Sequence, residues 1–374
     1  MHGLTVLALL STPVARAADD TPWTDRISIS GDVRYRNEWS ITRPGDLDMR
    51  WRQRVRARLG IVGTVVQDQL VAGIRIRTGN PGDPNSPHQT LGSDFASFTV
   101  NLDQVSLQWN PDGGHSAIWA GKFASPFYEA PVYADTVWDQ DINPDGVAAN
   151  VALVHGDGLR WSLRPAAYLL LEQDNGVGSG AYDTNDAYLF AGQSVLSTKV
   201  GDGRVTLANA LYDIPDATPA DNPALLAGSV GNAVNAAGTE YVSKFQILDN
   251  IVGAELVMGE QKLDLNARFV VNFGASSDNI GWQVGADLPL KVGKVGLKPF
   301  ADVHALQQEA FYSDLIGDDH QVGIGYLGAV AGLDIKATKG VGVKVWGIFD
   351  HSDLATSADP GLNSRARIDV NAKF

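Results

Sequence analysis

The chain has 374 residues, of which 44% are hydrophobic and 19% are charged, and it contains no cysteine. The missing cysteine excludes disulfide bonds and thiolate metal sites. The formal net charge of -14 disfavours nucleic-acid binding, and no segment approaches the run of about 20 apolar residues that a membrane-spanning helix needs.

The N-terminal residues predict an export signal. Residues 4–10 are an apolar stretch, and residues 15–17 fit a small-x-small cleavage site. We expect residues 1–17 to be a cleaved signal peptide and residues 18–374 to form the mature protein. One departure is that residues 1–3 contain no lysine or arginine, which such signals normally carry.

From residue 27 onward the chain alternates between apolar and polar positions. Residues 50–58 place five arginines on every second position, with mainly apolar residues between them. Residues 27–39, 262–273 and 365–374 alternate in the same way, and a period of two is typical of β-strands. In a soluble sheet the apolar register would face a core. In an outer-membrane barrel it would face lipid, and the polar register would line the lumen. The alternation changes phase between Leu102 and Val105, which predicts a β-bulge.

Short turns and long loops alternate between these strands. The short turns are expected at residues 65–67, 110–114, 155–157, 200–203, 259–261, 291–293 and 337–340. The long loops are expected at residues 40–49, 79–96, 125–145, 173–186, 214–238, 274–279, 308–319 and 350–362. Seven turns and eight loops predict about sixteen strands. We therefore expect an all-β fold, a transmembrane antiparallel β-barrel with short periplasmic turns and long extracellular loops.

Charge is distributed unevenly between the strands and the loops. The long loops carry about half of the acidic residues, and their only basic residue is Arg43. The acids keep the rim hydrated, bind divalent cations that bridge lipopolysaccharide phosphates, or screen solutes. Aromatic belts are expected at both membrane interfaces, and the loop-end belt includes Trp346.

Three stretches resemble the bacterial outer-membrane putative porin family and, in architecture, the general diffusion porins. They are the Gly121-Lys122 pair, the segment Trp138-Asp139-x-Asp141-x-x-Pro144-x-Gly146 and the last strand with its terminal Phe374. The resemblance implies a homotrimer in outer-membrane lipid and lipopolysaccharide that lets small hydrophilic solutes or ions diffuse passively. It also implies that Phe374 is the assembly signal read by the barrel-assembly machinery.

The resemblance further implies a constriction in which loop 125–145 folds inward. Its acids would be Glu129, Asp135, Asp139, Asp141 and Asp145. The basic ladder opposite them would be Arg34, Arg36, Arg50, Arg52, Arg54, Arg56, Arg58, Arg75 and Arg77. Opposed charges across a narrow passage create a transverse field that sorts polar solutes.

Alternatives stay open at this point. The loop acids could face outward, and the arginines could pair with strand carboxylates such as Asp32 and Glu38. The barrel could also be a substrate-specific channel, or a structural or adhesin barrel that does not conduct. A saturable conductance would indicate the specific channel.

Several other motifs predict little. Asp141, Asn143 and Asp145 match the first half of a calcium loop, but Ala152 stands where a glutamate is expected, so we favour a tight turn and no metal. Residues 323–328 match a dinucleotide-binding glycine pattern inside an expected strand, without the helix that it needs. Asp318, Asp319 and His320 could touch a metal ion, but we favour a solvated loop there. His304 alone among the histidines falls on a lumen-facing register, and no Ser–His spacing stands out, so we predict neither an enzyme nor a cofactor.

Overall fold

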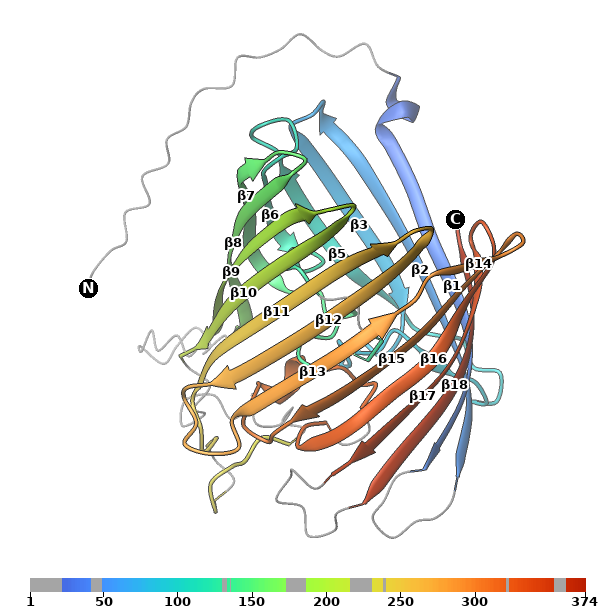
Figure 1. The fold of residues 1–374 in the computed structure, drawn as a ribbon, viewed down its shortest axis with the longest axis vertical. Coiled ribbons are helices and arrows are strands. Elements are labelled where there is room, and N and C mark those ends of the chain that lie inside the picture. The colour runs from blue at the N-terminus through green and yellow to red at the C-terminus, as the bar shows by residue number, and fades with distance from the viewer. Residues whose placement is uncertain are drawn as a thin grey trace, which may run out of the picture.

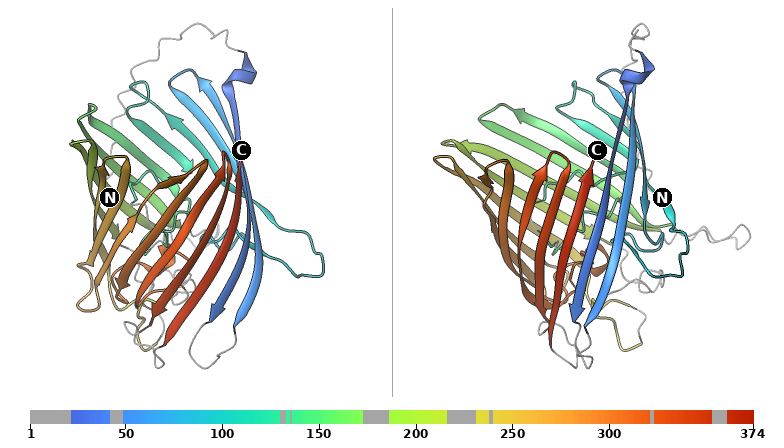
Figure 2. Two further views of the ribbon diagram at one scale, coloured as in Figure 1. Left: turned by 45° about the vertical axis from the view of Figure 1, so that its right-hand side comes forward. Right: turned by 90° about the vertical axis from the view of Figure 1, so that its right-hand side faces the viewer.

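The computed structural model describes residues 22–41, 49–129, 133–134, 136–172, 186–215, 231–237, 240–320, 323–352 and 361–374. Their strands form one closed antiparallel barrel (Figures 1 and 2). The first strand, β1 (Ile27–Ile41), pairs with the last, β18 (Leu362–Lys373), so the sheet has no open edge. The expected signal peptide, residues 1–17, lies outside the described residues.

The remaining strands follow one another around the barrel, each beside its neighbour in sequence. They are β2 (Arg50–Val66), β3 (Leu70–Thr78), β5 (Val100–Trp109), β6 (Ala117–Lys122), β7 (Asp145–His155), β8 (Leu159–Leu171), β9 (Ala187–Val200), β10 (Gly203–Ile214), β11 (Phe245–Met258), β12 (Gln261–Asn272), β13 (Ile280–Asp287), β15 (Val295–Leu306), β16 (Tyr326–Thr338) and β17 (Val341–His351). Two short 3-10 helices are also described, η1 (Trp23–Arg26) and η2 (Ser313–Leu315).

Two short strands explain why eighteen labelled strands make a barrel of sixteen. Strand β14 (Leu290–Val292) continues β13 along the same partner, β15, so the two count as one. Strand β4 (Gln89–Thr90) belongs to a loop and only adds to the loop end of β2. The prediction of about sixteen antiparallel strands is confirmed.

The bulge predicted in β5 lies at Asp103. Gln104 pairs with Arg75 and Leu102 pairs with Ile76, so Asp103 is the extra residue on its strand. The bulge turns Asp103 into the lumen, where its side chain is buried.

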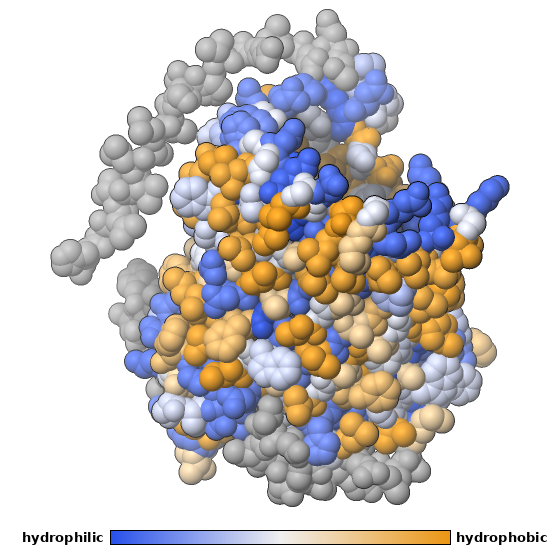
Figure 3. Space-filling model, viewed as in Figure 1, coloured by the Kyte–Doolittle hydropathy of each residue, from blue (hydrophilic) through white to orange (hydrophobic). Residues whose placement is uncertain are grey.

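The outer wall of the barrel is apolar. Residues such as Ile29, Leu107 and Val284 are exposed on the outward register of their strands. Figure 3 shows hydrophobic residues over much of the visible wall and a gathering of hydrophilic residues at the turn end. No helix among the described residues is long and apolar enough to cross a membrane.

The inside of the barrel is divided into an apolar half and a charged half. The described parts of two long connections enter the lumen: residues 123–129, 133–134 and 136–144 of the third loop, and residues 307–320 and 323–325 of the seventh loop. Trp138 of the third loop packs on Tyr168 of β8 and Tyr212 of β10, and Phe311 of the seventh loop meets Tyr212 edge-on. This buried apolar cluster fills the side lined by β8 to β12. Most of the buried charged residues lie on the opposite side, from β16 to β3, beside a smaller apolar cluster that includes Phe300, Val330 and Trp346.

Three expectations about individual positions are wrong. Trp346 is not part of a lipid-facing belt, because it shares the inward register of β17 with Lys344 and is 4% exposed. Residues 318–320 are not a solvated loop, since His320 is buried inside the lumen. The glycine pattern at residues 323–328 lies partly before β16 rather than inside a strand.

Candidate functional site

The charged half of the lumen is built where β1 lies between β2 and β18. Strand register places Arg34, Arg36 and Glu38 opposite Arg56, Arg54 and Arg52 on one side. On the other side the same three residues face Asn371, Asp369 and Arg367. The alternating pattern of three neighbouring strands therefore gathers these charges on one surface.

Glu38 is the centre of this surface. Its side chain is fully buried and accepts a hydrogen bond from Arg367 Nε at 2.7 Å and another from Arg52. Arg54 and Arg365 approach the same carboxylate at 3.8 and 3.9 Å. One carboxylate thus partly neutralises four guanidinium groups.

Two further strand carboxylates neutralise other arginines of the ladder. Asp32 accepts hydrogen bonds from Arg56 at 2.6 Å and from Arg58 at 2.7 Å. Asp369 accepts two from Arg36, at 2.6 and 3.1 Å. The pairing of arginines with strand carboxylates, raised from the sequence as the alternative to an inward loop, is present together with the inward loop.

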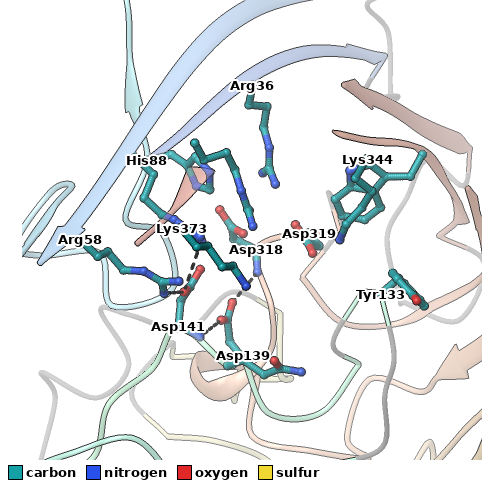
Figure 4. Close-up of a pocket in the computed structure, with 14 residues that line it drawn as sticks. Arg36, Arg58, His88, Tyr133, Asp139, Asp141, Asp318, Asp319, Lys344 and Lys373 are labelled. Carbon is teal, nitrogen blue, oxygen red and sulfur yellow. Dashed lines mark hydrogen bonds and ion pairs between the residues drawn. The ribbon is translucent and has the colours of Figure 1, made fainter. Parts of the chain in front are cut away.

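The third loop brings two acids to this surface. Asp141 accepts a hydrogen bond from Arg58 at 3.0 Å and lies 4.0 Å from Arg56. Asp139 accepts a hydrogen bond from the backbone N–H of Asp318 at 3.3 Å, which joins the third loop to the seventh. Figure 4 shows Asp141 beside Arg58, and Asp139 next to Asp141 and Asp318.

The seventh loop brings two acids that the sequence analysis expected in a solvated loop, Asp318 and Asp319. Asp319 pairs with Arg367, while the carbonyl groups of both residues accept hydrogen bonds from Arg365. Burial opposes ionisation of Asp319, but Arg367 and Arg36 together outweigh it and hold its pKa below the usual range. Burial and the neighbouring Asp319 raise the pKa of Asp318.

These groups surround a cavity of about 250 Å³, which we call the inner cavity. Its lining includes Arg34, Arg36, Arg56, Arg58, Lys344, Lys373, Asp139, Asp141, Asp318, Asp319 and Trp346. His88 also lines it, and burial together with Arg36 holds the pKa of His88 well below its usual range. His88 is therefore neutral at pH 7.

A second cavity of about 970 Å³, the mouth cavity, lies at the turn end and shares Arg34, Lys344 and Lys373 with the inner cavity. Its other charged residues are Lys298, Lys336, Lys339 and Asp334. No carboxylate of the described residues lies within 4.0 Å of Arg34, Lys344 or Lys373. Arg34 instead donates to the Asn371 side chain at 2.6 Å, and Lys344 lies over the Trp346 ring. Three cations without a close carboxylate therefore lie where the two cavities join.

The structure divides the predicted basic residues into separate groups. Arg34, Arg36, Arg56 and Arg58 line the inner cavity, whereas Arg52 and Arg54 lie around Glu38 next to it. Arg75 and Arg77 pair with Asp103. Arg50 is exposed at the loop end of β2 and lines neither cavity, because the strand leaves the lumen there.

The five predicted loop acids do not act as one group either. Asp139 and Asp141 face the ladder as described above. Glu129 points the other way and pairs with Arg268 of β12 at 2.8 Å, and burial raises its pKa to about 7. Asp145 is exposed at the start of β7 and pairs with Lys122. Asp135 lies outside the described residues.

The candidate calcium ligands are engaged by donors of the protein itself. Asp141 binds Arg58, Asp145 binds Lys122 at 2.8 Å, and the Asn143 side-chain oxygen accepts from Arg75 at 3.2 Å. Each of the three candidate ligands thus has a cationic partner that would repel Ca²⁺, so the half-motif is better explained as a turn.

Phe374 lies against the first strand. Its backbone N–H donates to Gly31 O at 3.1 Å, and its carbonyl oxygen accepts from Gly31 N at 3.0 Å. A side-chain carbon at Gly31 would come within 2.5 Å of the Phe374 ring, so glycine is needed for this contact. The terminal residue thus completes the seam between β18 and β1.

Several residues of the site were not selected from the sequence. Arg365, Arg367 and Lys373 belong to a polar register that the sequence did show, and this pattern was the available signal. Asp318 and Asp319 carried no such signal, because a loop has no periodicity to show which way its side chains point.

Comparison with known proteins identifies the family of this barrel. The family model described as "Putative porin" matches residues 45–246. No curated protein matches the sequence significantly.

Solved structures with the same fold include OprB of Pseudomonas putida, with 13% identity, a TM-score of 0.63, and coverage of 94% of this chain and 95% of that one. OmpF of Salmonella typhi, solved in complex with daunomycin, has 12% identity, a TM-score of 0.54, and coverage of 94% and 99%. A mutant of the Rh. blastica porin has 15% identity, a TM-score of 0.51, and coverage of 93% and 100%. The family match covers more than half of the chain, and the fold agrees with it: this protein belongs to the putative porin family, whose barrels are outer-membrane channels.

Proposed function

We propose that this porin is a passive diffusion channel for small hydrophilic solutes and ions, with a weak preference for anions. The observation that carries the proposal is the excess of positive charge along the two cavities. Six cationic side chains and four side-chain carboxylates line the inner cavity, and six cationic side chains and one side-chain carboxylate line the mouth cavity.

The physical reason is that fixed charges act strongly in a narrow, partly desolvated passage. Cations on the wall raise the local concentration of anions and repel other cations. Carboxylates at an exposed rim are screened by salt over about 8–10 Å and weigh less. Asp139, Asp141, Asp318 and Asp319 face the ladder and oppose its effect, so the preference is weak rather than strict.

The same four acids and the ladder give the passage a transverse field. Arg36 and Arg58 stand on one side of the inner cavity, and the acids of the third and seventh loops stand on the other (Figure 4). A polar solute aligns its dipole in such a field, and this interaction offsets the hydration that the solute loses in the passage, whereas an apolar solute gains no such interaction. This arrangement supports selection of hydrophilic solutes.

We also propose a homotrimer in the outer membrane, inserted by the barrel-assembly machinery with Phe374 as its signal, with acidic loops near lipopolysaccharide. The apolar outer wall supports the membrane location. The packing of Phe374 on Gly31 at the closing seam supports a role in assembly.

Single-channel recording in a planar bilayer tests the channel. A step conductance that rises linearly with salt, with a reversal potential shifted toward anion permeation, is the expected result. Saturation of conductance by one solute would replace the proposal with a substrate-specific channel. Absence of steps from protein that is folded would favour a structural barrel.

A further inference from the structure

Four buried side chains meet in the lumen where the seventh loop contacts the wall. Asp302 and His304 come from β15, Asp350 comes from β17 and His320 comes from the seventh loop. His304 Nδ1 lies 2.8 Å from Asp302 Oδ1, and His304 Nε2 lies 3.0 Å from Asp350 Oδ1. His320 Nδ1 lies 3.0 Å from Asp350 Oδ2. None of the four is more than 4% exposed.

The cluster has too few positive charges if both imidazoles are neutral. Asp302 and Asp350 then carry two negative charges, and no lysine or arginine of the described chain lies within 4.0 Å of either carboxylate. An uncompensated buried charge is strongly unfavourable. A divalent cation, or two further protons, would neutralise the cluster.

The number of protons on His304 indicates the same deficit of positive charge. A neutral imidazole has one N–H, but both ring nitrogens of His304 face carboxylate oxygens. If Nδ1 donates to Asp302, the lone pair of Nε2 faces Asp350 Oδ1. His320 adds a second lone pair if its proton is on Nε2, because its Nδ1 then faces Asp350 Oδ2 without a hydrogen.

We propose that His304, His320 and Asp350 bind one divalent transition-metal ion of the zinc type. The three candidate ligand atoms all lie within 4.8 Å of one another. A tetrahedral Zn²⁺ bound at 2.0–2.1 Å separates its ligand atoms by roughly 3.3 Å, so two of the present contacts are already close to that spacing. His320 is carried by a loop and is the ligand that adjusts.

The donor set explains the class of metal. Imidazole nitrogen suits Zn²⁺, Cu²⁺ and Ni²⁺, whereas Ca²⁺ and Mg²⁺ take oxygen ligands. Asp302 is a positioning residue, because a carboxylate on the far nitrogen of a ligating histidine fixes its tautomer and ring orientation. Gly328 leaves room for the cluster, since a side-chain carbon there would collide with Asp350 Oδ1 and lie 2.7 Å from His304 Nε2.

The site has a consequence for the inner cavity. His320 directly follows Asp318 and Asp319, which meet Arg365 and Arg367. A metal ion that joins His320 to β15 and β17 would fasten this part of the loop to the wall. The ion would therefore fix the positions of Asp318 and Asp319, two of the acids that line the inner cavity. This effect does not depend on whether the barrel conducts.

Metal stoichiometry tests the proposal directly. The full chain is purified without a polyhistidine tag, refolded in detergent with ZnCl₂, passed over a desalting column and assayed for zinc by elemental analysis. His115 and His155 are exposed and stack at 4.1 Å, so they could bind zinc on the surface. All measurements therefore use the His115→Gln/His155→Gln double variant as the parent.

The parent is expected to retain one zinc ion per chain, and His320→Gln or Asp350→Asn is expected to retain none. Asp302→Asn should keep the site but weaken it by about 10–100-fold. Folding of each variant is checked by its heat-modifiable migration. Replacement of Zn²⁺ by Co²⁺ should produce the visible absorption of a tetrahedral ion in the parent. If the folded parent binds no zinc, or if His320→Gln binds as much as the parent, the proposal is wrong and the cluster is held by protons instead.

Discussion

Glu38 of β1 and Arg367 of β18 form a fully buried ion pair across the seam where the barrel closes, with the Arg367 Nε donating to Glu38 Oε2 at 2.7 Å. The two residues are 329 positions apart in the chain. Arg52 of β2 pairs with the other oxygen of the Glu38 carboxylate. Closure of the barrel therefore depends on a charge cluster as well as on backbone hydrogen bonds.

Glu38→Gln should destabilise the barrel, because it leaves several guanidinium groups buried without their shared carboxylate. Loss of one partner of a buried ion pair costs about 3–5 kcal/mol. A closed barrel resists SDS until it is heated, so the temperature at which the fast-migrating folded band disappears on a gel reports this loss. The matched control is Glu255→Gln, whose pair with Lys262 is partly exposed and should matter little. Equal melting of both variants would contradict the role of Glu38.

Replacement of Arg34, Lys344 and Lys373 by glutamine should move the reversal potential toward cation permeation. These cations lie where the two cavities join and have no carboxylate partner among the described residues. The corresponding Arg52, Arg54 and Arg56 triple variant should act in the same direction but less, because only Arg56 lines the inner cavity. Lys199→Gln, an exposed residue outside both cavities, is the control. An unchanged reversal potential in both triple variants would remove the ladder from the selectivity mechanism.

Asp139→Asn together with Asp141→Asn should move the reversal potential the other way, toward anions. Both carboxylates line the inner cavity, and Asp141 pairs directly with Arg58. Asp145→Asn serves as the control, because this acid of the same loop region is exposed and pairs with Lys122. A larger shift from Asp145 than from the pair would mean that the constriction lies elsewhere.

Asp314→Asn should stabilise the protein at pH 8 and change little at pH 4. Burial raises the pKa of Asp314 to about 6, from 3.8. The folded state therefore favours the protonated carboxyl, and this contribution is present at low pH and lost as the pH rises through about 6. Asparagine stays neutral at every pH. The variant should therefore have a free energy of unfolding about 1–3 kcal/mol higher than the parent above that pH. Urea unfolding at the two pH values measures the difference, with exposed Asp68→Asn as control. A gain at pH 4 equal to that at pH 8 would contradict the assignment.

Deletion of Phe374 should lower the yield of protein in the outer membrane without changing the conductance of the channels that do form. The residue contacts Gly31 at the closing seam and lines only the mouth cavity, at the turn end. Phe374→Tyr keeps the aromatic ring and should restore the yield. A normal yield after deletion would contradict the proposal that Phe374 is an assembly signal.

The alternating pattern by itself determined the fold. Because side chains in a strand point alternately to opposite faces, one register faced lipid and the other faced the lumen along each strand. The same pattern predicted the number of strands, the positions of the turns and the inward direction of Arg34, Arg36, Arg54 and Arg56. The phase change between Leu102 and Val105 even predicted the bulge that turns Asp103 inward.

Only the tertiary structure decided how the lumen is used. A loop has no period, so nothing local indicated that Asp318, Asp319 and His320 lie inside or that Glu129 points away from the ladder toward Arg268. The same holds for Trp346, since tryptophan is stable both at a membrane interface and beneath lysine and arginine side chains. These positions depend on contacts between residues far apart in the chain, and such contacts form only when the barrel closes and its loops pack against the wall.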